Sequence, residues 1–185
     1  MTKTALILAV AIALSGCTQP TASTNSAGGD GKPAIKNGKP VPQFELARLN
    51  GGSLKTSDLK GKVTVIDFWA TWCESCIPEI PHFNELHKKY GDKGVQVLGF
   101  TMDSGTAEEI KPRAEEFHIE YPLILSDDKT VEGFGGILGY PTTFVISPDG
   151  TIYKKYIGAL GSKQQGIEKD IQTLLTRPAT SDTSN

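Results

Sequence analysis

Cysteine is scarce in this chain: only three occur among its 185 residues, at positions 17, 73 and 76. A structural zinc site usually takes four ligands, and the chain has no second cysteine pair that could complete one with Cys73 and Cys76. If Cys17 is used elsewhere, no cysteine remains for a structural disulfide. The chemistry of the chain is therefore expected to depend on the closely spaced pair.

Charge of one sign is also missing, because 19 Lys and Arg residues balance 21 Asp and Glu residues. The chain thus lacks the strongly basic character that nucleic-acid binding requires. Histidine occurs only as His82, His87 and His118, on predicted helices and without a second ligand at metal-binding spacing. We expect no nucleic acid partner, no metal and no organic cofactor.

The apolar run from Ala5 to Leu14 is too short to cross a bilayer as a permanent helix. It follows Lys3 and ends in Leu14-Ser15-Gly16-Cys17, which is typical of a signal peptide. The last four residues resemble the bacterial lipoprotein box, whose cysteine is lipidated and becomes the first mature residue. An ordinary secretory signal with an incidental Cys17 is the alternative. We expect a lipid-anchored protein on the periplasm-facing side of the bacterial cell envelope, with the choice of membrane left open.

The length suits one domain with short appendages. We expect residues 1–16 to form the lipoprotein signal peptide and residues 17–40 to form the lipidated cysteine and a flexible linker, since Thr, Ser, Ala, Gly, Asn and Pro dominate there without an apolar period. Residues 41–177 form the predicted domain, and residues 178–185 a polar tail.

Cys73 and Cys76 lie where a strand gives way to a helix. Val63–Trp69 is rich in β-branched and aromatic residues, as in a buried strand. A helical repeat of apolar residues follows, made of Ile77, Ile80, Phe83, Leu86 and Tyr90. We expect an exposed Cys73 near the helix N-terminus, where the dipole favours a thiolate, and Cys76 one turn further in. This spacing lets the second sulfur attack a mixed disulfide made by the first, which predicts thiol–disulfide exchange.

The remaining pattern alternates strands and helices. Strands are predicted at 44–49, 95–100, 121–125, 142–147 and 151–157, and helices at 56–59, 107–117, 127–134 and around 167–175. The order is a βαβ half, an additional αβ segment and a ββα half.

From about Val41 to Thr176 the chain resembles the TlpA/ResA-like branch of the thioredoxin superfamily, which comprises membrane-anchored disulfide oxidoreductases of the bacterial envelope. The matching residues are Phe68–Cys76, Glu79, Gly139–Phe144 and Asp149–Gly150. The resemblance implies an α/β thioredoxin fold: a central mixed β-sheet flanked by helices, with an N-terminal β extension and a central αβ insertion around Thr106–Leu125.

The resemblance also implies roles. Cys73 would attack a substrate disulfide and Cys76 would resolve the intermediate. Asp67 matches the aspartate that plain thioredoxins carry beneath the second cysteine, and its burial in an apolar strand would raise its pKa and suit it to proton transfer. Glu79 matches the acidic residue of the family and is a second candidate for the same task. The alternatives are an Asp67 that faces solvent at a strand end and a Glu79 on a solvated helix face.

Three residues are expected to bind substrate. The resemblance implies a cis Tyr140–Pro141 bond against the two sulfurs, with the Tyr140 backbone pairing with an extended substrate segment. Tyr140 replaces a smaller residue and either shapes the groove or belongs to the core. Trp72 would lie on the rim of the site, whereas Trp69 is expected in the core.

Glu74 and Ser75 stand between the cysteines, where plain thioredoxin has Gly-Pro. An anion beside Cys73 disfavours the thiolate, which predicts a reductase rather than an oxidase. The resemblance implies envelope protein disulfides as substrates, including those of apocytochrome c before haem attachment. A membrane thiol carrier would donate the electrons, and the protein would be a monomer.

Two other functions use the same fold. A thiol peroxidase would carry threonine three residues before its reactive cysteine, where this chain has Ala70. A non-catalytic copper-delivery protein would have a Cys-x-x-x-Cys spacing and a distant histidine.

Overall fold

The structure, a computed structural model, describes residues 38–159 and 161–176. The predicted signal peptide, Cys17, nearly all of the linker and the polar tail lie outside the described residues. At the start of the described part, the N–H of Ile152 donates to the carbonyl of Lys39 at 2.9 Å, and Pro40 forms an antiparallel bridge with Thr151. Pairing with the rest of the domain thus begins just before Val41.

A five-stranded mixed sheet forms the centre of the domain, in the order β5-β4-β3-β6-β7. Its strands are β3 (Val63–Trp69), β4 (Val95–Thr101), β5 (Leu123–Leu125), β6 (Thr142–Ile146) and β7 (Ile152–Ile157). β3 pairs in parallel with β4 and antiparallel with β6, and β4 pairs in parallel with β5. The predicted thioredoxin fold, with β3 as its central strand, is confirmed.

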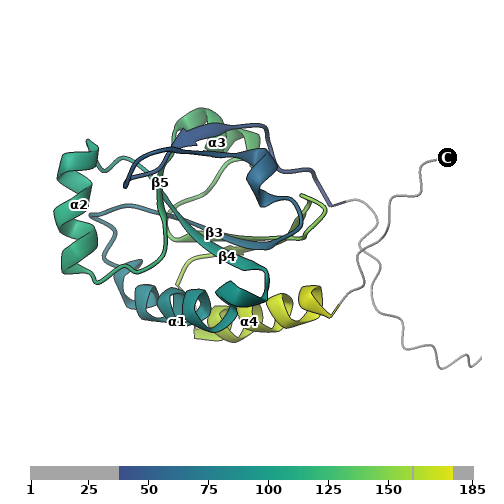
Figure 1. Ribbon diagram of the computed structural model, residues 1–185. Helices are drawn as coiled ribbons and strands as arrows, with labels where there is room; N and C mark the ends of the chain where they lie inside the picture. The colour runs from purple at the N-terminus through teal and green to yellow at the C-terminus, as the bar shows by residue number, and fades with distance from the viewer. Residues whose placement is uncertain (1–37, 160, 177–185) are drawn as a thin grey trace, which may run out of the picture. The chain divides into compact units, whose positions relative to one another are not determined.

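Helices cover one face of this sheet (Figure 1). α1 (Ile80–Tyr90) and the last helix, α4 (Gly161–Leu175), lie side by side there. Their apolar residues share one core cluster with Val65, Trp69 and Val97 of the sheet. α2 (Ala107–Glu116) follows β4 and adds Ile110 to the same cluster.

The other face is covered by α3 (Asp128–Gly133) and by the hairpin of β1 (Glu45–Ala47) and β2 (Ser53–Lys55) (Figure 1). The hairpin is the predicted N-terminal extension, and α2 with β5 is the predicted insertion. Thr56–Leu59 forms a 3₁₀ turn after the hairpin. The core on this side is rich in phenylalanine.

Several elements are shorter than predicted, and in two of them proline is the reason. The strand predicted at 121–125 contains only Leu123–Leu125, since Pro122 has no N–H to donate to a ladder and instead accepts from Gly99 N–H. The helix predicted to start near Cys73 is also shorter, and this changes the site.

Candidate active site

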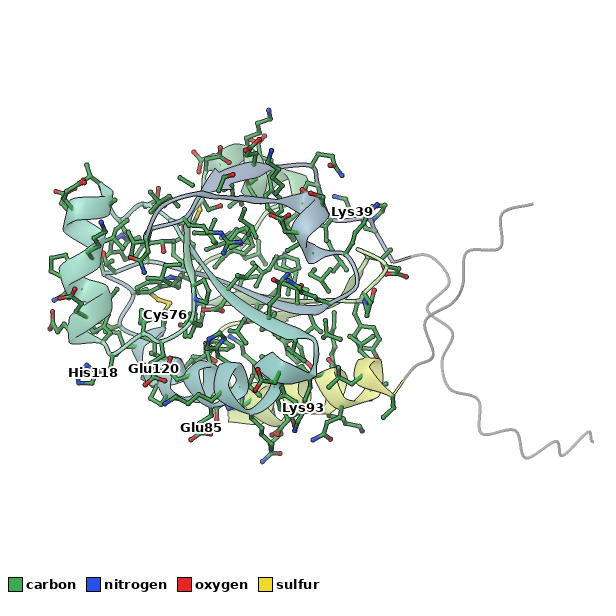
Figure 2. All side chains as sticks on the ribbon, in the orientation of Figure 1. Lys39, Cys76, Glu85, Lys93, His118 and Glu120 are labelled. Carbon is green, nitrogen blue, oxygen red and sulfur yellow. A yellow bond between two sulfur atoms is a disulfide. The ribbon has the colours of Figure 1, made fainter. Side chains whose placement is uncertain are left out.

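The two cysteines form a disulfide. The Cys73–Cys76 S–S distance is 2.02 Å and the two Cα atoms lie 5.4 Å apart. Only 5% of Cys73 and 3% of Cys76 is exposed. Figure 2 labels Cys76 near the end of the sheet from which α1 starts. The expectation of an exposed Cys73 is therefore wrong for this oxidised state.

The helix after the disulfide begins later than the apolar repeat predicts. α1 starts at Ile80, and a 3₁₀ turn, Ile77–Glu79, precedes it. Pro78 and Pro81 have no N–H for the helical i→i−4 bond, so the chain turns more tightly before the α-helix forms. The prediction that Cys76 lies one turn into the helix is wrong.

This correction changes the electrostatics of the pair. The N–H of Cys73 donates to the carbonyl of Ala70, and the N–H of Cys76 donates to the carbonyl of Cys73, both at 3.0 Å. These amides are therefore engaged within the turn. They are not free to donate to the Cys73 sulfur, which removes two of the donors expected at a helix N-terminus.

Asp67 lies in the middle of β3 and is 3% exposed. Side chains alternate along a strand, so Asp67 points to the same face as Val65 and Trp69, toward α1 and α4. Its neighbour on β6 is Thr143, whose hydroxyl donates to Asp67 Oδ1 at 2.6 Å. Burial raises the pKa of Asp67 from an ordinary 3.8 to about 7. The alternative of a solvent-facing aspartate is excluded.

Glu79 is also buried, with 4% of its surface exposed, although the sequence left a solvated position open. It ends the 3₁₀ turn, and its Oε2 accepts a hydrogen bond from Lys163 Nζ at 2.7 Å. Burial raises the pKa of Glu79, while the hydrogen bond and charge of Lys163 oppose that rise. Both candidate proton carriers thus lie in the interior on the α1 and α4 face.

Lys163 is a site residue that the sequence analysis missed. It lies in the first turn of α4, is 3% exposed, and its Nζ is 4.0 Å from Asp67 Oδ1 as well as 2.7 Å from Glu79. The available signal was its spacing: Lys163 precedes Ile167 by four residues and Ile171 by eight, so it falls on the apolar face of the closing helix.

The rim of the site carries the residues predicted to bind substrate. Trp72 is 60% exposed, and its ring meets that of Tyr140 edge-on, with centroids 5.7 Å apart. The Tyr140–Pro141 bond is cis, as the resemblance implied. Asp103 joins the two aromatic residues: its carbonyl accepts from Trp72 Nε1 and its Oδ2 accepts from the Tyr140 hydroxyl, each at 2.9 Å. Tyr140 is therefore a rim residue that also packs on the core.

Trp69 belongs to the core, as predicted, with 1% exposed. Within residues 38–159 and 161–176, no group of three or more His, Cys, Asp and Glu side chains is arranged to hold a metal ion. No helix in the same part of the chain is long and apolar enough to cross a bilayer.

A mixed sheet of this topology with a Cys-x-x-Cys disulfide before its first long helix defines a thioredoxin-fold redox protein. The chain belongs to the AhpC/TSA family, whose model matches residues 37–155.

Relatives by sequence carry the same chemistry in their names. Thiol-disulfide oxidoreductase ResA of Bacillus anthracis is 33% identical over 141 residues, which cover 76% of this chain and 81% of the relative. Thioredoxin-like protein YneN of Bacillus subtilis is 30% identical over 138 residues, covering 74% of this chain and 81% of YneN.

Solved structures agree with this assignment. A thiol:disulfide interchange protein of the thioredoxin family from Chlorobium tepidum superposes with a TM-score of 0.66 at 26% identity, over 77% of this chain and 99% of that one. A second Chlorobium tepidum structure, assigned to the DsbE type, gives a TM-score of 0.69 at 29% identity over the same shares. The chain is a thiol-disulfide oxidoreductase of the ResA and DsbE type, with Cys73 and Cys76 as its disulfide.

Proposed function

We propose that this enzyme reduces protein disulfides in the bacterial envelope, held to a membrane by a lipid on Cys17. The observation that carries the proposal is the arrangement around the disulfide. Asp67 lies in β3, the strand that leads to the cysteines, and Glu79 follows Cys76 by three residues. Both carboxyl groups are buried, and the exposed Trp72 side chain precedes Cys73 directly.

The reaction starts from the dithiol. The Cys73 thiolate attacks one sulfur of a substrate disulfide, so that a mixed disulfide forms and the first substrate thiolate leaves. Cys76 then gives its proton to a buried carboxylate and attacks the Cys73 sulfur. The Cys73–Cys76 bond forms, the second substrate thiolate leaves and takes up a proton, and two electrons have passed to the substrate. A membrane thiol carrier returns the enzyme to the dithiol.

Exposed apolar side chains near the site favour a protein substrate over a small disulfide. Among the described residues, the exposed large hydrophobic side chains are Trp72, Leu138 and Ile157, at 60%, 87% and 49%. Leu138 precedes Tyr140 by two residues, and Ile157 pairs with Thr142, directly after Pro141. We expect an extended segment with apolar residues beside its cysteine to bind along Trp72, Tyr140 and Pro141.

Negative charge near the disulfide favours the reducing direction. Glu74 is exposed beside Cys73, and two buried carboxyl groups face a single lysine. An excess of negative charge disfavours the thiolate, and a reduced form that is weakly stabilised has a lower potential. A potential near about −120 mV, typical of the strong envelope oxidants, would contradict this direction, whereas one near about −270 mV would support it.

The test of the mechanism is the variant Cys76→Ser. Without the resolving sulfur, Cys73 should remain covalently bound to its substrate, so mixed disulfides should accumulate in cells and insulin reduction should fall to background. The matched control, Cys73→Ser, should also abolish turnover but trap nothing. A Cys76→Ser protein that retains full turnover, or a Cys73→Ser protein that traps the same partners, would overturn the proposed roles.

The substrate and the anchor need separate tests. A peptide with the disulfide form of a Cys-x-x-Cys-His haem-attachment segment should be reduced by the wild type, and failure with it but not with insulin would exclude apocytochrome c. Cys17→Ala should lose incorporation of labelled fatty acid and leave the membrane fraction. Retention of the label in that variant would contradict lipidation at Cys17.

The peroxidase alternative lacks a supporting observation at the place that matters. Position 70 carries alanine, which has no hydroxyl, where a peroxidase would have threonine. Ala70 is fully buried, and its carbonyl accepts the Cys73 N–H. Stoichiometric peroxide consumption by the dithiol form, measured against insulin reduction, distinguishes the two activities, and a copper titration tests metal delivery.

A further inference from the structure

Lys163 is the one lysine that is buried among the residues the structure describes. Lysine is almost never fully buried unless it is paired, so its position needs a reason. The reason lies in two carboxyl groups that come from distant parts of the chain. Asp67 comes from β3, Glu79 from the turn before α1, and Lys163 from α4, 84 residues after Glu79.

Lys163 lies at different distances from the two carboxyl groups. Its Nζ donates a hydrogen bond of 2.7 Å to Glu79 Oε2, but it lies 4.0 Å from Asp67 Oδ1, beyond hydrogen-bond distance. Asp67 Oδ1 accepts instead from the Thr143 hydroxyl at 2.6 Å. Glu79 therefore has a direct cationic partner, whereas Asp67 has a neutral donor and a more distant charge.

The charges in this cluster do not balance when both carboxyl groups are ionised. One ammonium would then face two carboxylates in the buried interior, and the excess negative charge would be costly. Binding one proton to a carboxyl group removes the excess. That proton is held more favourably where the ammonium is not directly bonded, because a charge-assisted hydrogen bond stabilises the ionised form.

We infer that Lys163 is a positioning residue that holds Glu79 as a carboxylate and leaves Asp67 as the group that exchanges a proton with Cys76. The inference rests on the proposed function for the step that it serves. When Cys76 attacks the Cys73 sulfur, its proton passes to the Asp67 carboxylate, and that proton is returned when the disulfide is next reduced to the dithiol.

The other groups around the cluster fit this assignment. Tyr121 faces both carboxyl groups, and burial together with their charges raises its pKa, so it remains neutral. Burial lowers the pKa of His82 on α1, and the charge of Lys163 lowers it further. His82 therefore adds no second cation at neutral pH. The Phe83 ring lies 6.0 Å from Lys163 Nζ and carries no charge. Lys163 is thus the cation that decides between Asp67 and Glu79.

The first experiment reads the carboxyl groups directly in the full wild-type domain. Carboxyl ¹³C NMR titration of the dithiol and disulfide forms should give the higher midpoint to Asp67 and the lower one to Glu79. A higher midpoint for Glu79 would overturn the inference. This measurement needs no turnover, so it remains decisive even if the protein reduces no protein disulfide.

The second experiment uses Lys163→Met, with Lys163→Arg as the conservative variant. Removing the cation should raise the Glu79 midpoint by about 1–3 pH units and shift the pH profile of mixed-disulfide resolution upward. Lys163→Arg should largely restore the wild-type profile, and Lys169→Met, an exposed lysine of the same helix, should not change it. An unchanged Glu79 midpoint and profile in folded Lys163→Met would refute the inference. If that variant does not fold, the wild-type titration and Lys163→Arg still decide.

Discussion

The two faces of the central sheet differ in kind, although β3 contributes to both. On the face toward α3 and the hairpin, Phe68 meets Phe100, Phe134 and Phe144 edge-on, with centroids 5.2 to 5.8 Å apart. On the opposite face, Asp67 takes a place between Val65 and Trp69. Since neighbouring residues of one strand point to opposite faces, a single sequence step separates an aromatic core from a buried charge cluster.

The difference shows how the fold tolerates buried charge. The aromatic face buries large rings that need no polar partners, and it contributes hydrophobic stabilisation. The α1 and α4 face buries Asp67, Glu79 and Lys163, whose desolvation opposes folding and is only partly offset by their pairing. We therefore expect substitutions on the first face to change stability alone, and substitutions on the second to change stability together with protonation.

Phe68→Ala should have the largest effect on stability. The side chain is fully buried, and its removal leaves a cavity among three other rings, so we expect a loss of about 3–5 kcal/mol in the free energy of unfolding. Urea denaturation of the disulfide form at fixed pH measures it. Phe44→Ala, at a half-buried ring on the same side, should lose less. A changed Asp67 titration in folded Phe68→Ala would contradict the separation of the two faces.

Asp67→Asn should change how stability depends on pH. The folded pKa is about 7 against an ordinary 3.8, so the folded protein binds the proton more tightly than the unfolded chain. The contribution of Asp67 to stability should therefore be largest below about pH 4 and be lost as the pH rises to about 7, by up to about 4 kcal/mol. The Asn variant should lose most of this slope and be more stable than the wild type at alkaline pH.

Denaturation of the disulfide forms at a series of pH values tests this slope. Asp170→Asn is a suitable control, since Asp170 is a buried carboxyl of α4 that bonds Tyr156 instead of the cluster, and the wild-type slope should persist in it. Equal slopes in the wild type and Asp67→Asn would show that Asp67 is not the buried acid that titrates.

Gly99→Ala should be destabilising by about 1–3 kcal/mol, because the added methyl group overpacks the sheet face that α1 and α4 cover. A Cβ at this position of β4 would lie 2.5 Å from Leu123 Cδ2 and 3.1 Å from Trp69 Nε1. Gly91→Ala is the matched control, since a Cβ there meets nothing within 4 Å. The melting temperatures of the two variants measure the difference. Equal melting temperatures would show that the α1 and α4 face is not tightly packed around Trp69.

Thr143→Val should have the smallest effect on stability, about 1 kcal/mol, but a clear effect on protonation. Its hydroxyl stabilises the Asp67 carboxylate, so its loss should move the pKa of Asp67 above about 7. Thr142 is the neighbour of Thr143 in β6, and its hydroxyl donates to the carbonyl of Gly139. Thr142→Val removes that hydroxyl and should not move the pKa of Asp67. Carboxyl NMR titration distinguishes the two, and equal Asp67 midpoints in both variants would rule out the Thr143 contribution.

Local patterns predicted most of the fold. The β-branched run of β3, the apolar repeat of α1 and the turn between β6 and β7 each carry their signal within a few residues. The predicted start of α1 was wrong because the apolar repeat continues through the 3₁₀ turn that precedes the helix. Pro78 and Pro81 lack the N–H groups that α-helical hydrogen bonds would need there. The sequence shows both prolines, and their missing N–H groups mark the later start of the helix.

The site was predicted in part. Cys73, Cys76, Asp67 and Glu79 lie on or beside one strand–helix junction, so their proximity follows from local structure. Lys163 reaches the same place only through the packing of α4 on α1, which no local pattern encodes. The resemblance did not supply this residue either, and only its place on an apolar helix face marked it as unusual.

Because Lys163 belongs to the last helix of the domain, the cysteines and both acids are synthesised before the cation that completes their environment. A chain truncated ahead of α4 would carry every sulfur and carboxyl group of the site with no internal counter-ion. The electrostatics of the site are thus complete only when the polypeptide has been synthesised through α4.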